Sequence, residues 1–181
     1  MPFLFLFLLL VLWVPTLSAA DAKLTRDGVD LFISARSPEQ ISAFYGVRGM
    51  PPSALQALSS ACFLTLGLHN RRAETLWLEP AKWRFIDADG KPIKLISRQE
   101  WTARWATLAV PLAAQSTFGW TQLPESRDLY PEESVGGNIS IQPPDGIFSL
   151  IARFRTGRRG EGALIEFKIP NLSCSRIGVA P

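Results

Sequence analysis

Two alternating segments near the end of the chain constrain the fold more than any other feature. In residues 148–155, and again in residues 163–169, every second side chain is apolar. A period of two is the spacing of a strand with one face in a core. The segment between them, residues 156–162, is rich in Gly and Arg, which predicts a hairpin turn. The chain therefore contains an antiparallel hairpin whose one face is buried.

Similar short patterns recur along the chain and predict further strands. The segment 62–69 places Cys62 and three leucines on one face, so we expect that cysteine to point into the core. Residues 87–90, Asp-Ala-Asp-Gly, predict a turn between two strands. The remaining strands are expected at residues 29–35, 75–78, 83–86, 92–96 and 138–141, with a further candidate at 117–122.

Helices are expected only as insertions between these strands. Ser37 and Gln40 form a capping box, with Pro38 at the first helical position, and predict a helical hairpin over residues 37–61. Ser97 and Glu100 form a second capping box, which predicts a helix over residues 98–108. Trp101 and Trp105 are four residues apart and share a face of that helix.

Many short strands with frequent turns predict an all-β fold, an antiparallel two-sheet sandwich. The segment 129–141, LYPEESVGGNISI, resembles a strand pattern of bacterial exported immunoglobulin-like domains, and the segment 75–90, TLWLEPAKWRFIDADG, is similar to a hairpin of the same domains. The resemblance implies an immunoglobulin-like sandwich and a binding or assembly role. It assigns no site residues, because that fold serves many functions.

The first twenty residues have the pattern of a secretory signal. Residues 3–14 are uninterruptedly apolar, Pro15 follows, and small residues precede Asp21. We expect cleavage after Ala20, with cleavage after Ala22 or retention as a membrane anchor as the alternatives. The expected organisation is a signal peptide, residues 1–20, and one domain, residues 21–181, that is periplasmic or secreted.

The only two cysteines, Cys62 and Cys174, predict one structural disulfide in an exported chain. Closing a loop of roughly 110 residues stabilises the fold by about 4 to 5 kcal/mol in the chain-entropy model. A redox or metal-binding role would favour a CxxC spacing or further ligands, which these cysteines lack.

No motif indicates an enzyme. His69 is the only histidine, and we expect it on the outer face of its strand. Asp87 and Asp89 begin like a calcium loop, but Lys91 and Pro92 follow, so a hairpin turn is the better interpretation. The net charge of +3 is too small and too dispersed to suggest nucleic acid. We expect no cofactor and no metal.

The tryptophans and one arginine cluster are the remaining candidates for a site. Trp101 and Trp105 are expected to pack their helix onto the sheets, and the alternative is an exposed aromatic platform. The candidate binding surface for that alternative consists of Trp77, Trp101, Trp105, Arg153 and Arg155. The leading hypothesis is an exported, non-enzymatic domain that binds a protein partner in the cell envelope or serves in envelope assembly. The alternative is a carbohydrate-binding module that uses exposed tryptophans. Membrane contact is expected only if the N-terminal segment is retained.

Overall fold

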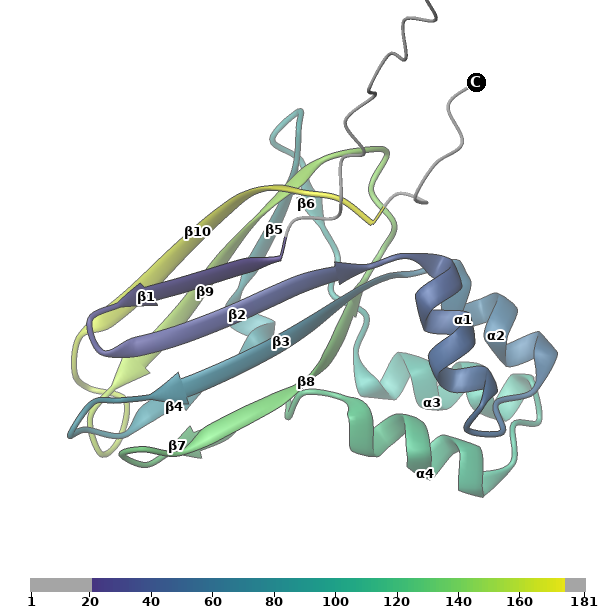
Figure 1. The fold of residues 1–181 in the computed structure, drawn as a ribbon, viewed down its shortest axis with the longest axis horizontal. Helices are drawn as coiled ribbons and strands as arrows, with labels where there is room; N and C mark the ends of the chain where they lie inside the picture. Colours follow the sequence, from purple (N-terminus) through teal and green to yellow (C-terminus); the bar gives the residue numbers. More distant parts are fainter. Residues whose placement is uncertain (1–20, 175–181) are drawn as a thin grey trace, which may run out of the picture.

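The computed structural model describes residues 21–174 and contains two antiparallel sheets with four helices at one end (Figure 1). The elements, in chain order, are β1 (Ala22–Arg26), β2 (Val29–Arg36), α1 (Pro38–Gly46), α2 (Pro52–Ser59), β3 (Cys62–Asn70), β4 (Leu76–Leu78), a 3-10 turn η1 (Pro80–Lys82), β5 (Arg84–Asp87), β6 (Pro92–Ile93), α3 (Arg98–Thr107), α4 (Leu112–Thr121), β7 (Arg127–Leu129), β8 (Ser134–Ile141), β9 (Phe148–Thr156) and β10 (Leu164–Leu172).

The first sheet has the strand order β1-β2-β3-β8. The second sheet is built around β9. Strand β10 pairs with almost the whole of β9, so β5 and β4 must follow one another along the opposite edge of β9. Strands β6 and β7 extend this sheet beyond β5 and β4.

Alternation explains the core that the two sheets share. Every second residue of β9, from Phe148 to Phe154, is buried, and so is every second residue of β3, from Cys62 to Leu68. These side chains belong to one apolar cluster with members from both sheets. The antiparallel sheets and the predicted hairpin around residues 156–162 are therefore confirmed.

A second apolar core lies between the helices. It is aromatic, with Tyr45, Phe63, Trp101, Trp105 and Phe118 in contact with one another. Phe63 is the only one of these that comes from a strand, and it points to the opposite face of β3 from Cys62. Strand β3 thus contributes adjacent residues to both cores.

The local signals at the starts of α1 and α3 are confirmed. Ser37 Oγ accepts the backbone N–H of Gln40, and the Gln40 side chain accepts the N–H of Ser37. Ser97 and Glu100 repeat this arrangement at α3. Both boxes satisfy N–H groups that a helix start would leave unpaired.

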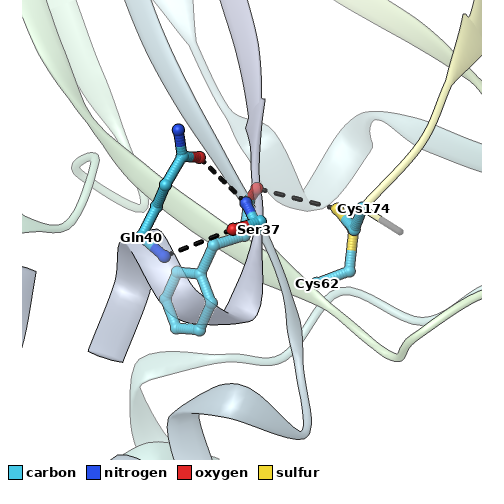
Figure 2. Close-up of a disulfide and its surroundings, with 5 residues drawn as sticks. Ser37, Gln40, Cys62 and Cys174 are labelled. Carbon is cyan, nitrogen blue, oxygen red and sulfur yellow. Dashed lines mark hydrogen bonds between the residues drawn. A yellow bond between two sulfur atoms is a disulfide. The ribbon is translucent and has the colours of Figure 1, made fainter. Parts of the chain in front are cut away.

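The predicted disulfide joins Cys62 to Cys174, across 112 residues. Figure 2 shows the bond beside the start of α1, near Ser37 and Gln40. Cys174 Sγ also lies 3.7 Å from the carbonyl oxygen of Phe63. The bond ties the end of β10 to the beginning of β3, and such a crosslink is compatible with an exported protein.

One predicted strand is wrong, and some elements of the structure were not expected. Residues 117–122 are not a strand, because they belong mostly to α4, where Ala114 and Phe118, four residues apart, pack into the second core. Strand β1 was not expected, and its outer residues are exposed. The sheet-rich antiparallel architecture with inserted helices is confirmed, whereas a fourth helix, α4, and a separate core among the helices were not expected. The signal-peptide prediction concerns residues 1–20, outside the described residues.

Candidate ligand-binding groove

The structure divides the predicted binding surface. Trp101 and Trp105 are both 2 % exposed and stack on each other, so they are core residues and do not form an exposed binding surface. Their placement removes both from the candidate binding surface: the helix that carries them faces the second core, and burying two indoles there stabilises it. The carbohydrate hypothesis thereby loses two of its three tryptophans.

Trp77, Arg153 and Arg155 lie on the outer face of the second sheet. Trp77 is half-buried, and its indole N–H donates to the carbonyl of Gly157 in the hairpin turn at 2.7 Å. Arg153 pairs with Glu166 at 2.8 Å, whereas the Arg155 side chain is exposed. The structure therefore brings these three together and separates them from Trp101 and Trp105.

His69 lies on the outer face of the first sheet, as expected, but beside groups that the sequence did not single out. Its Nδ1 is 2.7 Å from Ser134 Oγ, and its Nε2 is 3.4 Å from a carboxylate oxygen of Glu132. A serine, a histidine and an acid in this order are the parts of a nucleophilic triad. The Glu132 side chain is 73 % exposed, so solvent screens the attraction between its carboxylate and the imidazole of His69.

A pocket of about 320 Å³ lies where the sheets meet the helices, and we call it the junction pocket. Four separate parts of the chain form it: η1, the start of α3, the link from α4 to β7, and β8. Its walls are largely apolar, from Leu95, Ile96, Trp101, Leu123 and Ile139. Its polar groups come from Arg98, Gln122, Glu125, Asn138 and Ser140. A concave apolar pocket with a few convergent polar groups is the usual form of a ligand site.

A buried polar cluster centred on Tyr45 supports the back of this pocket. The Tyr45 hydroxyl accepts the side-chain N–H groups of Gln122 at 3.0 Å and Asn138 at 3.3 Å. It donates to Thr121 Oγ1 at 2.7 Å, because the Thr121 hydroxyl donates in turn to Phe118. Burial raises the pKa of Tyr45, so the phenol stays neutral and its hydrogen bonds persist.

A more open groove of about 530 Å³ adjoins the junction pocket and shares Arg98, Gln122 and Pro124 with it. We call it the Trp120 groove, after the indole on its wall, which is 90 % exposed. Gly119 and Ser116 of α4 form the same wall, Arg127 lies at β7, and Val135 and Gly136 of β8 complete it. An exposed indole beside a groove is typical of a binding hot spot.

The edge of β8 faces this groove with backbone groups that have no neighbouring strand. In an antiparallel strand, the N–H and C=O of a residue point to one side, and successive residues alternate. The carbonyl of Asn138 accepts the N–H of Leu123 at 2.9 Å, on the side away from β3. Gly136, two residues earlier, points its N–H and C=O to that side as well. Among the described residues, the isolated β-bridges on this side of β8 involve Asn138 and Ile141, and neither involves Gly136.

Charged side chains of both signs line the rim of the junction pocket and of the Trp120 groove. The guanidinium of Arg98 donates to the carbonyl of Gln122 at 3.3 Å, and Glu125 accepts the backbone N–H of Arg98 at 3.2 Å. Arg127 lies 3.8 Å from Glu133, a loose exposed pair. These groups can fix the orientation of a bound chain, while the apolar walls supply most of the contact area.

The groove was missed by sequence reasoning because α4 was not predicted. Had residues 112–121 been assigned to a helix, Leu112, Ser116 and Trp120 would have fallen on one exposed face at a spacing of four. In the described part of the chain, no three His, Cys, Asp or Glu side chains gather as metal ligands would. No helix of residues 21–174 combines the length and apolarity that crossing a bilayer demands.

Comparison with known proteins identifies no family. No model of a known protein family matches the chain, and no characterised protein matches it by sequence. Among solved structures, the chain is similar to the YjhA protein of Bacillus subtilis, with 8 % identity, a TM-score of 0.44, and coverage of 72 % of this chain and 76 % of that one. It is also similar to a "putative lipoprotein (ycdA)" of Bacillus subtilis, with 11 % identity, a TM-score of 0.43, and coverage of 84 % of this chain and 39 % of that one.

Proposed function

We propose that the protein is an exported, non-enzymatic binding domain that holds an extended segment of a partner protein in the cell envelope. The segment would place an apolar side chain in the junction pocket and continue along the Trp120 groove. The observation that carries this proposal is the continuity of the two hollows through Arg98, Gln122 and Pro124. The disulfide supports export, and the two antiparallel sheets with a common core support the proposed immunoglobulin-like character.

The chemistry of the hollows favours a polypeptide over a sugar. Sugars need many hydrogen bonds, whereas Leu95, Ile96 and Ile139 offer none from their side chains. The outward N–H and C=O of Gly136 suit a neighbouring extended backbone, as in peptides that add a strand to a sheet edge. Main-chain bonds at that edge and an apolar anchor in the pocket would act together on one segment.

A carbohydrate-binding module is the second candidate, and Trp120 is the observation that favours it. An indole that is 90 % exposed can stack on the apolar face of a sugar ring. This role would use the open groove and leave the junction pocket empty, so the two candidates differ in which residues contribute to affinity.

A random library of displayed twelve-residue peptides, screened alongside a panel of soluble envelope glycans, tests the proposal on the full chain with its disulfide formed. We expect enriched peptides to bind at least about tenfold more weakly to Trp120→Ala, because hot-spot aromatics contribute about 2 kcal/mol or more. We also expect Ile139→Ala, in the pocket wall, to weaken them.

Leu112→Ala is the matched control for Trp120→Ala. Leu112 lies on the same helix and is 80 % exposed, but it does not line the groove. Peptide affinity should be unchanged in this variant. Equal losses in both variants would refute the site, and glycan binding that depends on Trp120 but not on Ile139, with no enriched peptide, would establish the second candidate instead.

A further inference from the structure

The outer face of the second sheet carries an excess of cations that the proposed groove does not use. The register places Arg84 and Lys168 on either side of Ile151, and Trp77 and Leu164 on either side of Arg155. Arg153 lies between these two rows on β9. We call this surface the basic face.

The hairpin turn between β9 and β10 extends the basic face. Gly160 of this turn lies against the Trp77 indole and the Arg155 side chain, so the turn folds over that corner of the sheet. Arg158 and Arg159 are both exposed in the same turn. The carboxylates nearby are fewer: Glu166 pairs with Arg153 and Lys168, Asp128 is opposite Trp77, and Glu161 accepts the N–H of Arg159.

Apolar side chains interrupt the cations on this face. Leu164 is 47 % exposed, and Ile151 and Trp77 are half-buried among the arginines. Figure 1 shows that the helices gather at one end of the sheets, so they leave this face uncovered. Cations with interspersed aliphatic and indole side chains match the interface of a bilayer, where phosphates lie beside the first carbons of the acyl chains.

We propose that the basic face binds the surface of an anionic phospholipid bilayer. The arginines would contact lipid phosphates, and Leu164 and Trp77 would lie at the level of the headgroups. This contact needs no N-terminal anchor, and it is independent of the groove, which lies at the junction with the helices. A membrane-bound domain would therefore keep the Trp120 groove available to a partner.

Co-sedimentation of the full chain with vesicles tests the proposal. One set of vesicles contains equal parts of phosphatidylglycerol and phosphatidylcholine, and the other contains phosphatidylcholine alone. The N-terminal apolar segment has no charged side chain and is the same in every variant, so differences between variants on the anionic vesicles report the basic face. We expect binding to the anionic vesicles to exceed binding to the neutral ones and to fall as salt is raised.

The charge-reversal pair Arg84→Glu/Arg155→Glu should lower the partition coefficient on anionic vesicles by about tenfold or more. The control pair Lys23→Glu/Lys91→Glu makes the same change in net charge at exposed sites, on β1 and in the β5–β6 turn. Its effect should stay within about twofold, since charges beyond a Debye length are screened. If the reversal pair fails to fold by circular dichroism, Arg84→Gln/Arg155→Gln should give a smaller loss in the same direction.

Three results would overturn the proposal. Equal binding to neutral and anionic vesicles would remove the role of charge. Equal losses in the two charge-reversed pairs would show that net charge matters and the basic face does not. Binding of soluble polyphosphate at the same affinity per charge, with vesicle binding unchanged in Leu164→Ser, would identify a site for polymeric anions in place of a lipid surface.

Discussion

The hydroxyl groups of Tyr45 and Thr121 lie 2.7 Å apart, although 76 residues separate them in the chain. Tyr45 belongs to α1 and Thr121 to the last turn of α4. The same phenol accepts hydrogen bonds from Gln122 and Asn138, which line the junction pocket. One side chain thus positions two helices and β8 around the candidate site.

Tyr45→Phe should therefore destabilise the protein by about 1 to 3 kcal/mol, because the buried amide of Asn138 loses its acceptor. The measurement is the free energy of unfolding in urea. Tyr130→Phe is the control, since Tyr130 is 56 % exposed, and it should change little. Equal stability of Tyr45→Phe and the wild type would mean that the cluster contributes nothing.

Gly137 permits a close approach that no other residue would allow. A Cβ at this position would lie 2.5 Å from the backbone nitrogen of Leu123, where the α4–β7 link crosses β8. Gly137→Ala should cost about 1 to 3 kcal/mol and should also weaken ligand binding, because the displaced backbone forms the pocket wall. Thermal or urea unfolding checks the first effect.

Gly119→Ala is the matched opposite. A Cβ there meets nothing within 4 Å, and the residue is in α4. The substitution should stabilise the protein by about 0.5 to 1 kcal/mol through the higher helix propensity of alanine. A stabilising Gly137→Ala, or a strongly destabilising Gly119→Ala, would contradict the packing described for β8 and α4.

The hydroxyl of Thr156 is buried, and the described residues give it no hydrogen-bond partner. Thr156→Val removes this unpaired group and keeps the shape of the side chain, so stability should stay the same or rise by up to about 1 kcal/mol. Thr121→Val, whose hydroxyl is bonded to Tyr45, should lose stability in the same assay. A loss above about 1 kcal/mol in Thr156→Val would reveal a partner for its hydroxyl.

Stability at acid pH should depend on Glu100. The ammonium of Lys94, and then the backbone N–H of Ser97, lower the pKa of Glu100 from 4.5 to about 2. A carboxyl whose pKa is lowered by folding stabilises the protein above its unfolded pKa and loses that contribution as pH falls towards the folded value. The difference in unfolding free energy between wild type and Glu100→Gln should therefore be constant well above pH 4.5 and should shrink steadily as the pH falls from there through about 2. A difference that stays undiminished at pH 2 would contradict the assigned cause.

Removal of the disulfide should lower the unfolding free energy by about 4 to 5 kcal/mol in the chain-entropy model, given its separation of 112 residues. The test compares the wild type with Cys62→Ala/Cys174→Ala in urea. Mass spectrometry without reductant should show no alkylation at either cysteine. Alkylation of both thiols in the purified protein would refute the bond.

The sequence predicted those elements whose formation depends on residues close together in the chain, such as capped helix starts and strands with one buried face. The capping residues Ser37 and Ser97 act on N–H groups three positions away, and the alternation from Phe148 to Phe154 needs only one buried face. Helix α4 was not predicted because Thr117, Phe118 and Trp120 have high strand propensity. In the structure, the burial of Phe118 against Trp101 and Trp105 favours the helix over a strand. Strand β1 was not predicted because it is an exposed edge strand, and its sequence lacks the regular alternation of apolar and polar residues.

The candidate site could not be predicted in the same way. Its walls come from η1, α3, α4, β7 and β8. The spacing of residues within any one of these segments does not indicate that the segments meet in space. The sequence showed that tryptophan is abundant, but it left a core and a binding surface both open for Trp101 and did not single out Trp120 as exposed. That distinction depends on which helix face the second core covers.

Cys62 and Phe63, adjacent in β3, point into different cores, and this fixes how the molecule can come apart. The helices cannot detach from the sheets without pulling Phe63 out of their own interior, and the sheets cannot open at this end while the bond to Cys174 holds. Amide hydrogens of β3 should consequently be among the slowest to exchange, and the helical end and the sheets should melt as a single unit.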